Sequence, residues 1–398
     1  MKQNKRSFYQ HIAQTSDNPM GLEIETAKGP YIFTADGRKY VDFISGIAVS
    51  SLGHRHPKVT KAIKEQVDRH LHVMVYGEYI QEAQSAYAKL LTDQLPETLS
   101  RAYFVNSGTE ANEGALKISK KHTGRHKFVA FRHGYHGDTQ GSLSVTGRDV
   151  YREPYQPLLP DVHFADFNSP DVLPLIDNET AAVIMEPIQG EGGIIPADKR
   201  WLKSIRKRCD EAGALLIFDE VQTGFFRTGS LFAFQQYQVV PDILCLAKAM
   251  GGGMPIGAFV SSSEIFENFK QNPPLNHVTT FGGHPVSCAA AHATLSQLLE
   301  KDCGAKTQRI EQATRNLLTA DGIVEVRGQG AMLGMELRSV ELTQKVVEEC
   351  LDRGIILGWT LHSDTLVRLA PPLIINEGLL NETLSTINEV VNKFSKEN

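Results

Sequence analysis

The sequence predicts an α/β fold: a large domain with a mostly parallel sheet covered by helices, plus a smaller α+β domain. Between about 100 and 290, short and nearly continuous apolar runs alternate with segments of helical pattern. Such strands are typical of parallel sheets buried on both faces. After about residue 300 the alternation gives way to a mixed pattern. We therefore expect an N-terminal segment (1–50) packing with the small domain, a large domain (51–295) and a C-terminal small domain (296–398).

The composition is that of an ordinary globular protein. The 398 residues are 41% hydrophobic and 22% charged, and the formal net charge of −5 gives no support to a nucleic-acid partner or an anionic membrane. No apolar run has membrane-spanning length, and the first ten residues lack the apolar core of a signal peptide. The five cysteines follow neither a disulfide framework nor metal-ligand spacing. We expect a soluble cytoplasmic protein without a metal.

The N-terminal segment carries a hairpin signal. Asp36-Gly37 separates two runs of strand pattern, and Asp-Gly favours a tight turn between strands. Beyond it, His54 and His56 are spaced i, i+2, which suits no helical metal pair, so a turn is predicted there. A helical pattern then runs from Val59 toward His72.

The elements of the two domains follow from apolar runs and their period. Strands of the large domain are predicted at 103–105, 128–131, 182–185, 215–218, 243–246 and 258–260, and helices at about 109–121, 198–212 and 285–300. The small domain is predicted from helices near 305–318, 341–353 and 377–395 and from apolar runs at 324–330, 354–357 and 366–369. Ligands of parallel sheets bind outside the carboxyl ends of the strands, and the polar motifs of this chain follow predicted strands.

Two of these strand ends carry Asp219 and Lys248. A buried lysine has a lowered pKa and can form a Schiff base with an aldehyde. A buried carboxylate keeps a pyridine nitrogen protonated, so that the ring accepts electrons. Together they are typical of pyridoxal phosphate. Taken alone, Asp219 could equally be a strand-end cap and Lys248 a surface side chain.

A second motif, 106–112, places Ser107, Gly108 and Thr109 at the start of a predicted helix. Unpaired N–H groups and the helix dipole favour a phosphate there. Simple N-capping by Ser107 or Thr109 is the alternative, and both can hold at once.

Three further side chains have a functional and a structural interpretation. Tyr135, near a strand end between glycines, is placed to stack on a planar cofactor or to pack in the core. Glu191 lies in a glycine-rich loop, where a carboxylate is usually solvated. Arg368 lies inside an apolar run and is not expected to be buried unpaired. Its planar guanidinium suits a carboxylate, either of a substrate or of Glu191.

In this order along the chain, these motifs resemble the class III aminotransferases (ornithine, acetylornithine and 4-aminobutyrate type) of pyridoxal-phosphate fold type I. The resemblance runs from Gly29 to about Val391 and rests on five motifs: 107–111, 186–192, 219–224, 246–248 and 280–283.

The resemblance implies a role for each matching residue. Lys248 would bind the cofactor and move the proton, and Asp219 would pair with the pyridinium nitrogen. The implied cofactor-binding set is Ser107, Gly108, Thr109, Tyr135, Glu186, Asp219, Val221, Gln222, Lys248 and Thr280. Thr280 would reach the phosphate of the neighbouring subunit, which implies a homodimer with shared active sites. Arg368 would bind a substrate carboxylate, and Glu191 would pair with Arg368 when an ω-amine donor is bound.

The chain departs from the family pattern at three positions. Asp138 stands where members that use 2-oxoglutarate often carry arginine, which increases the resemblance to the diaminopelargonate-forming branch. Against this, the motif 151–154 resembles the acetylornithine branch, and Arg152 could supply the missing charge. Ile47 stands where ornithine aminotransferases carry a tyrosine, and His284 replaces an asparagine.

The sequence thus predicts a transaminase that moves a terminal amino group to 2-oxoglutarate by a ping-pong mechanism. The expected donor is an ω-amino acid or its N-acyl derivative, such as N-acetylornithine. Alternatives are another class III branch (diaminopelargonate-forming, 4-aminobutyrate, lysine or ornithine) or a racemase or decarboxylase on the same fold. A non-catalytic cofactor-binding regulator would lack Lys248 or Asp219, and both are present.

Overall fold

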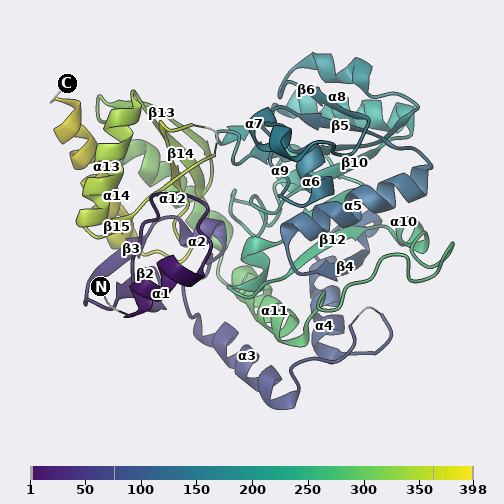
Figure 1. The fold of residues 1–398 in the computed structure, drawn as a ribbon, viewed down its shortest axis with the longest axis horizontal. Helices are drawn as coiled ribbons and strands as arrows, with labels where there is room; N and C mark the ends of the chain where they lie inside the picture. Colours follow the sequence, from purple (N-terminus) through teal and green to yellow (C-terminus); the bar gives the residue numbers. More distant parts are fainter. Residues whose placement is uncertain (1–2, 76, 362, 397–398) are drawn as a thin grey trace.

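The computed structural model describes residues 3–75, 77–361 and 363–396. Figure 1 shows the N-terminal strands beside the C-terminal elements, and a larger sheet with its helices on the other side of the molecule. No helix in the described part of the chain is long and apolar enough to cross a membrane. All five cysteines are buried and free, as expected for small apolar filler.

The larger body is organised by a seven-stranded sheet of order β4-β12-β11-β10-β7-β5-β6. Only β12 runs against its neighbours, so the sheet is mostly parallel, as predicted. Its strands are β4 (Arg101–Val105), β5 (Lys127–Phe131), β6 (Val162–Ala165), β7 (Thr180–Met185), β10 (Leu215–Asp219), β11 (Ile243–Leu246) and β12 (Gly257–Ser261). All were predicted except β6, a partly exposed edge strand with a histidine in its short apolar run.

Alternation along these strands builds two cores, one on each face of the sheet. Phe128, Ile184 and Ile217 pack on one face with α5 (Gly108–Thr123). Their sequence neighbours Val129, Val183 and Leu216 enter the other core, with α8 (Lys199–Ala212). Because strands covered on both faces have no polar side, they form the continuous apolar runs seen in the sequence.

Further helices complete this body. The predicted helix 285–300 is α11 (Pro285–Glu300), which packs on α3 (Pro57–Arg69) and α4 (Glu82–Thr92). The short elements around the sheet are α6 (Gln140–Val145), α7 (Asp149–Arg152), α9 (Phe234–Tyr237), α10 (Ser263–Glu267), β8 (Ile188–Gln189), β9 (Ile195–Pro196), η1 (Glu97–Leu99), η2 (Glu153–Tyr155), η3 (Pro170–Leu175) and η4 (Lys248–Gly251).

The smaller body joins the two ends of the chain. The predicted hairpin is present, with Gly37 in a left-handed conformation (φ 85°). The third N-terminal strand pairs in parallel with β15 near the C-terminus. The four-stranded sheet contains β1 (Ile24–Lys28), β2 (Tyr31–Thr34), β3 (Lys39–Asp42) and β15 (Ile355–Ile356). The helix α1 (Gln3–His11) precedes β1, and α2 (Ser45–Ala48) follows β3. The boundaries 1–50, 51–295 and 296–398 stay a prediction.

A second four-stranded sheet and three helices form the rest of the smaller body. They are β13 (Ile323–Gln329), β14 (Met332–Leu337), β16 (Gly358–Trp359), β17 (Leu366–Leu369), α12 (Cys303–Leu317), α13 (Val340–Asp352) and α14 (Glu377–Ser395). In the predicted turn at 54–56, His54 Nε2 lies 2.9 Å from Asp42 Oδ2, so its role there is to fasten a loop to β3.

Candidate active site

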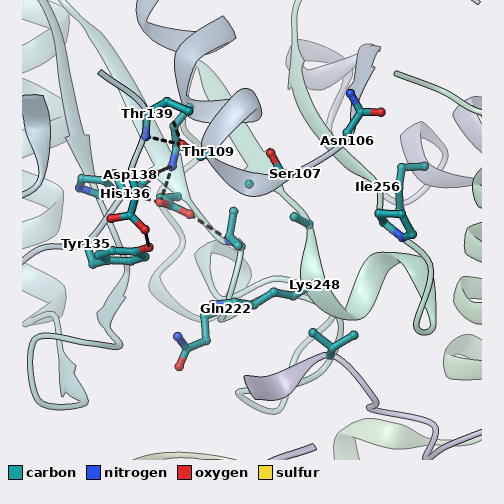
Figure 2. Close-up of a pocket in the computed structure, with 18 of the residues that line it drawn as sticks. Asn106, Ser107, Thr109, Tyr135, His136, Asp138, Thr139, Gln222, Lys248 and Ile256 are labelled. Carbon is teal, nitrogen blue, oxygen red and sulfur yellow. Dashed lines mark hydrogen bonds and ion pairs between the residues drawn. The ribbon is translucent and has the colours of Figure 1, made fainter. Parts of the chain in front are cut away.

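The carboxyl ends of β4, β5, β7, β10 and β11 lie at one edge of the large sheet, where a cavity of about 620 Å³ opens. Figure 2 shows the side chains that line it. They include every predicted cofactor-binding residue except Thr280: Ser107, Gly108, Thr109, Tyr135, Glu186, Asp219, Val221, Gln222 and Lys248. Residues from four separate motifs are therefore brought together because parallel strands end at the same edge.

Asp219, the last residue of β10, is buried and held by three groups. Asn112 Nδ2 donates to Asp219 Oδ2 over 2.8 Å, and His136 Nδ1 lies 2.9 Å from the same oxygen. The other oxygen accepts from the backbone N–H of Val221 at 3.1 Å. Asn112 and His136 were not among the predicted site residues. A signal was available, since Asn112 follows Gly108 by one helical turn and His136 adjoins Tyr135.

Lys248 begins η4 just after β11 and has a left-handed backbone (φ 47°). The same turn needs Gly252 and Gly253 at positive φ, where glycine has no steric penalty. Burial lowers the pKa of Lys248, an effect that the nearby Glu191 carboxylate opposes. A lowered pKa increases the fraction of free amine, the form that attacks an aldehyde and accepts protons.

The N-terminus of α5 points its first turn at the cavity, and Ser107 caps it by accepting from Glu110 N at 3.3 Å. The hydroxyl of Thr109 lies 2.6 Å from Ser142 Oγ and 2.8 Å from Thr139 Oγ1. Capping and anion binding, the two interpretations of this motif, are compatible in this geometry, since a 16-residue helix directs free N–H groups at the same place.

Gly108 is required by close packing. A Cβ atom at this position would lie 2.8 Å from both methyl carbons of Val221, closer than carbon atoms tolerate. Val221 also lines the cavity. The glycine therefore lets the start of α5 approach the valine that forms part of the cavity wall.

Glu186 joins two loops of the site. Its carboxylate accepts from the backbone N–H of Tyr135 at 3.1 Å and from that of Gly190 at 2.9 Å. Burial raises the pKa of Glu186 to about 7, with the Asp219 charge adding to the rise and His136 opposing it. Tyr135 in turn donates its hydroxyl to Asp138 Oδ2 over 2.8 Å.

Arg368 on β17 forms a buried ion pair with Glu191, which also accepts from Leu361 N at 3.1 Å. Burial acts to raise the pKa of Glu191, but the charge and hydrogen bond of Arg368 outweigh it and lower the pKa. Of the two carboxylates considered for Arg368, the structure shows Glu191. The pair lies outside the residues that line the cavity.

Three further predicted residues are not among those that line the cavity. Thr280 is in an exposed loop, and Ile47 is 49% exposed in the N-terminal segment. Arg152 pairs with Asp149 and lies with its guanidinium carbon 4.1 Å from the centre of the Phe164 ring. His284, whose role was open, caps α11 by accepting from Val286 N at 3.3 Å.

The cavity fits pyridoxal phosphate by the chemistry of its groups. Asp219 offers a carboxylate for a pyridinium nitrogen, Lys248 an amine for an aldehyde, and the α5 N-terminus donors for a phosphate. Tyr135 and Val221 offer an aromatic and an aliphatic surface for a planar ring. Within the described residues no cluster of three or more His, Cys, Asp or Glu side chains could hold a metal ion.

Comparison with known proteins agrees with this chemistry. The family model for class III aminotransferases matches residues 12–391. Acetylornithine aminotransferase of Methanopyrus kandleri is 42% identical over 369 residues, 92% of each chain. Putrescine aminotransferase of Pectobacterium atrosepticum is 38% identical, over 93% of this chain and 82% of its own. The PLP-bound structure of an amine transaminase from an uncultivated Pseudomonas species has a TM-score of 0.88 at 27% identity and covers 96% of this chain and 99% of its own.

Proposed function

Since the chain belongs to the class III aminotransferases, which depend on pyridoxal phosphate, we propose that it moves a terminal amino group of an aliphatic donor to 2-oxoglutarate. The observation that carries this proposal is that Lys248, Asp219 and the N-terminus of α5 line one cavity. Each serves a different part of the cofactor. When bound, pyridoxal phosphate supplies an aldehyde that captures amines and a ring that accepts electrons.

The protein then has to orient the reactants and move protons. Asp219 holds a proton at the pyridine nitrogen, while Asn112 and His136 fix its carboxylate. Lys248, whose pKa is lowered, would remove the proton from the carbon that bears the donor amine and deliver it to the carbon that receives the amine. In the second half of the ping-pong cycle the amine of Lys248 would move the proton in the opposite direction, so that the keto acid becomes the amine product.

The remaining lining residues hold the cofactor in place. Ser107, Gly108 and Thr109 would hold its phosphate, Gln222 its phenolic oxygen, and Val221 and Tyr135 the faces of its ring; all six line the cavity. Glu186 supports this arrangement indirectly, because it fixes the backbone of Tyr135.

Arg368 and Glu191 form the proposed switch between the two substrates. While Glu191 neutralises Arg368, an uncharged or cationic part of the donor can lie beside the pair at little electrostatic cost. When the keto acid enters, its carboxylate takes the place of Glu191 on Arg368. The ion pair in the structure supports this proposal because it is the arrangement expected for the donor half.

We further propose a cytoplasmic homodimer in which Thr280 reaches the phosphate site of the partner. Support comes from exposed apolar side chains in this loop and in the connection between α3 and α4, where the ring centre of His72 lies 5.0 Å from that of Phe281. They are Leu71, Tyr79, Ile80, Val278 and Phe281. Exposed apolar patches of this kind are typical of protein interfaces. Ile47 and Arg152, which lie outside the cavity lining, are proposed as substrate contacts at its periphery.

N-acetylornithine is the first donor to test, because several relatives are named acetylornithine aminotransferases. The test is the visible absorbance of the cofactor-loaded protein when the donor is added without a keto acid. We expect N-acetylornithine to remove the band and 2-oxoglutarate to restore it. Lys248→Ala should show neither change. A band that responds to another amine but not to N-acetylornithine would assign a different donor, and a wild type that responds to no amine would overturn the proposal.

A further inference from the structure

The charges around the cavity are unbalanced. In the described part of the chain, its lining contains the carboxylates Asp138, Glu186 and Asp219, one lysine (Lys248) and no arginine. Asp219 and Glu186 are each engaged by hydrogen bonds within the site. Asp138 is exposed, and a single hydrogen bond, from the hydroxyl of Tyr135, reaches it.

Asp138 is held in place by that bond. The hydroxyl of Tyr135 donates to Oδ2 over 2.8 Å, and the other oxygen has no hydrogen-bond partner among the described residues. Burial, together with this bond, raises the pKa of Tyr135 well above its ordinary value, so the hydroxyl stays protonated and keeps donating. Figure 2 shows Asp138 beside Tyr135, with Lys248 set apart from both. One carboxylate oxygen is therefore free to face a molecule whose amine has reached Lys248.

We propose that Asp138 determines donor specificity: it favours donors whose far end carries a second ammonium group over donors whose far end carries a carboxylate. This inference rests on the proposed function, because it concerns the donor of that reaction. It ranks N-acetylornithine, whose far end carries a carboxylate and an uncharged amide, below a diamine donor. A fixed carboxylate attracts a distal ammonium and repels a distal carboxylate. No arginine in the described lining compensates this charge, and Arg368 is neutralised by Glu191.

The competing explanation is that Asp138 only positions the ring of Tyr135. Two substitutions separate the explanations. Asp138→Asn removes the charge but keeps an oxygen that accepts from the Tyr135 hydroxyl. Tyr135→Phe removes the hydrogen bond but keeps the charge. If charge is what matters, only Asp138→Asn changes the preference between donors that differ in distal charge.

The matched donors are 1,4-diaminobutane and 4-aminobutyrate, which share a primary amine and differ in the charge of the other end, with butylamine as an uncharged reference. Their dissociation constants are measured by calorimetry on cofactor-loaded Lys248→Ala, which binds without turnover, with and without Asp138→Asn. We expect Asp138→Asn to reduce the preference for the diamine over 4-aminobutyrate by about tenfold. The lost attraction of the distal ammonium and the lost repulsion of the distal carboxylate each contribute about threefold, as is typical of partly exposed charges. The preference should also weaken with added salt. Tyr135→Phe, combined with Lys248→Ala in place of Asp138→Asn, should leave the preference for the diamine unchanged.

An unchanged ratio of dissociation constants in Asp138→Asn, or an equal loss in Tyr135→Phe, would overturn the inference, as would a protein that binds neither compound. The ratio of the kcat/KM values for the two donors, measured in enzymes that retain Lys248, provides the second readout. A wild type that transaminates no amine would refute the proposed function itself, whereas active variants with unchanged ratios would refute only the role of Asp138.

Discussion

His136 Nδ1 lies 2.9 Å from Asp219 Oδ2, and both residues are buried and line the cavity. The second ring nitrogen, His136 Nε2, is buried without a hydrogen-bond partner in the described part of the chain. The imidazole is therefore committed to Asp219. It fixes the carboxylate that is proposed to pair with the pyridine nitrogen.

Replacing His136 with phenylalanine should weaken cofactor binding and turnover, because Asp219 loses one of the three groups that orient it. We expect about a tenfold increase in the dissociation constant of pyridoxal phosphate, as for loss of one hydrogen bond to a charged group. Fluorescence titration of the cofactor checks this. Asp219→Ala, which removes the carboxylate, should reduce kcat much further, by about a hundredfold or more.

Gly108→Ala should reduce cofactor affinity, since the new Cβ would lie 2.8 Å from the methyl carbons of Val221 and shift the start of α5. Overpacking of this kind costs about 1–3 kcal/mol. Val221→Ala removes those methyl carbons, so the double variant should bind the cofactor better than the loss from each single change predicts. Strictly additive losses would show that the contact is not the cause.

Arg368→Ala should raise KM for 2-oxoglutarate strongly, by about thirtyfold or more, and also lower the melting temperature. The thermal effect follows because Glu191 would remain buried without its partner. Glu191→Gln is the matched variant: it should affect the donor half-reaction more than the keto-acid half. Rapid-mixing measurements of the two halves distinguish these effects, and equal losses in both halves for both variants would contradict the switch.

The stability of the protein without cofactor should fall as pH rises from about 4.5 to 7, in part through Glu220. Burial raises the pKa of this side chain from 4.5 to about 7, although it accepts from Ala233 N and Phe234 N. The folded state then binds a proton more tightly than the unfolded state, and this stabilisation is lost as pH passes through the folded pKa. Glu220→Gln should flatten the slope in denaturant titrations. An unaltered slope would show that Glu220 does not titrate there.

Ile80→Asp should dissociate the proposed dimer, because Ile80 is 98% exposed beside other apolar side chains and a buried charge at an interface is costly. Light scattering should give half the mass of the wild type, with loss of activity as Thr280 leaves the partner's site. Val324→Asp is the control: Val324 is 66% exposed on β13, apart from the apolar patch, and its substitution should leave the mass unchanged.

Much of the fold was predictable from the sequence, because strands covered on both faces have a plain apolar pattern. Two of the elements that were not predicted have local causes. The edge strand β6 is only partly buried, and β14 follows β13 through Gly330 in a single hairpin without a clear break in the pattern. Where burial is one-sided or a turn is very short, the period of the sequence carries little information.

The sequence by itself determined which chemistry is present: a lysine and an aspartate at strand ends, and a hydroxyl-glycine turn before a helix, in one order along the chain. Only the tertiary structure decided the partners. It placed Asn112 and His136 around Asp219 and paired Arg368 with Glu191. The physical reason is that strand and helix patterns depend on neighbours in the chain, whereas these contacts join residues far apart in sequence, up to 177 positions for Glu191 and Arg368.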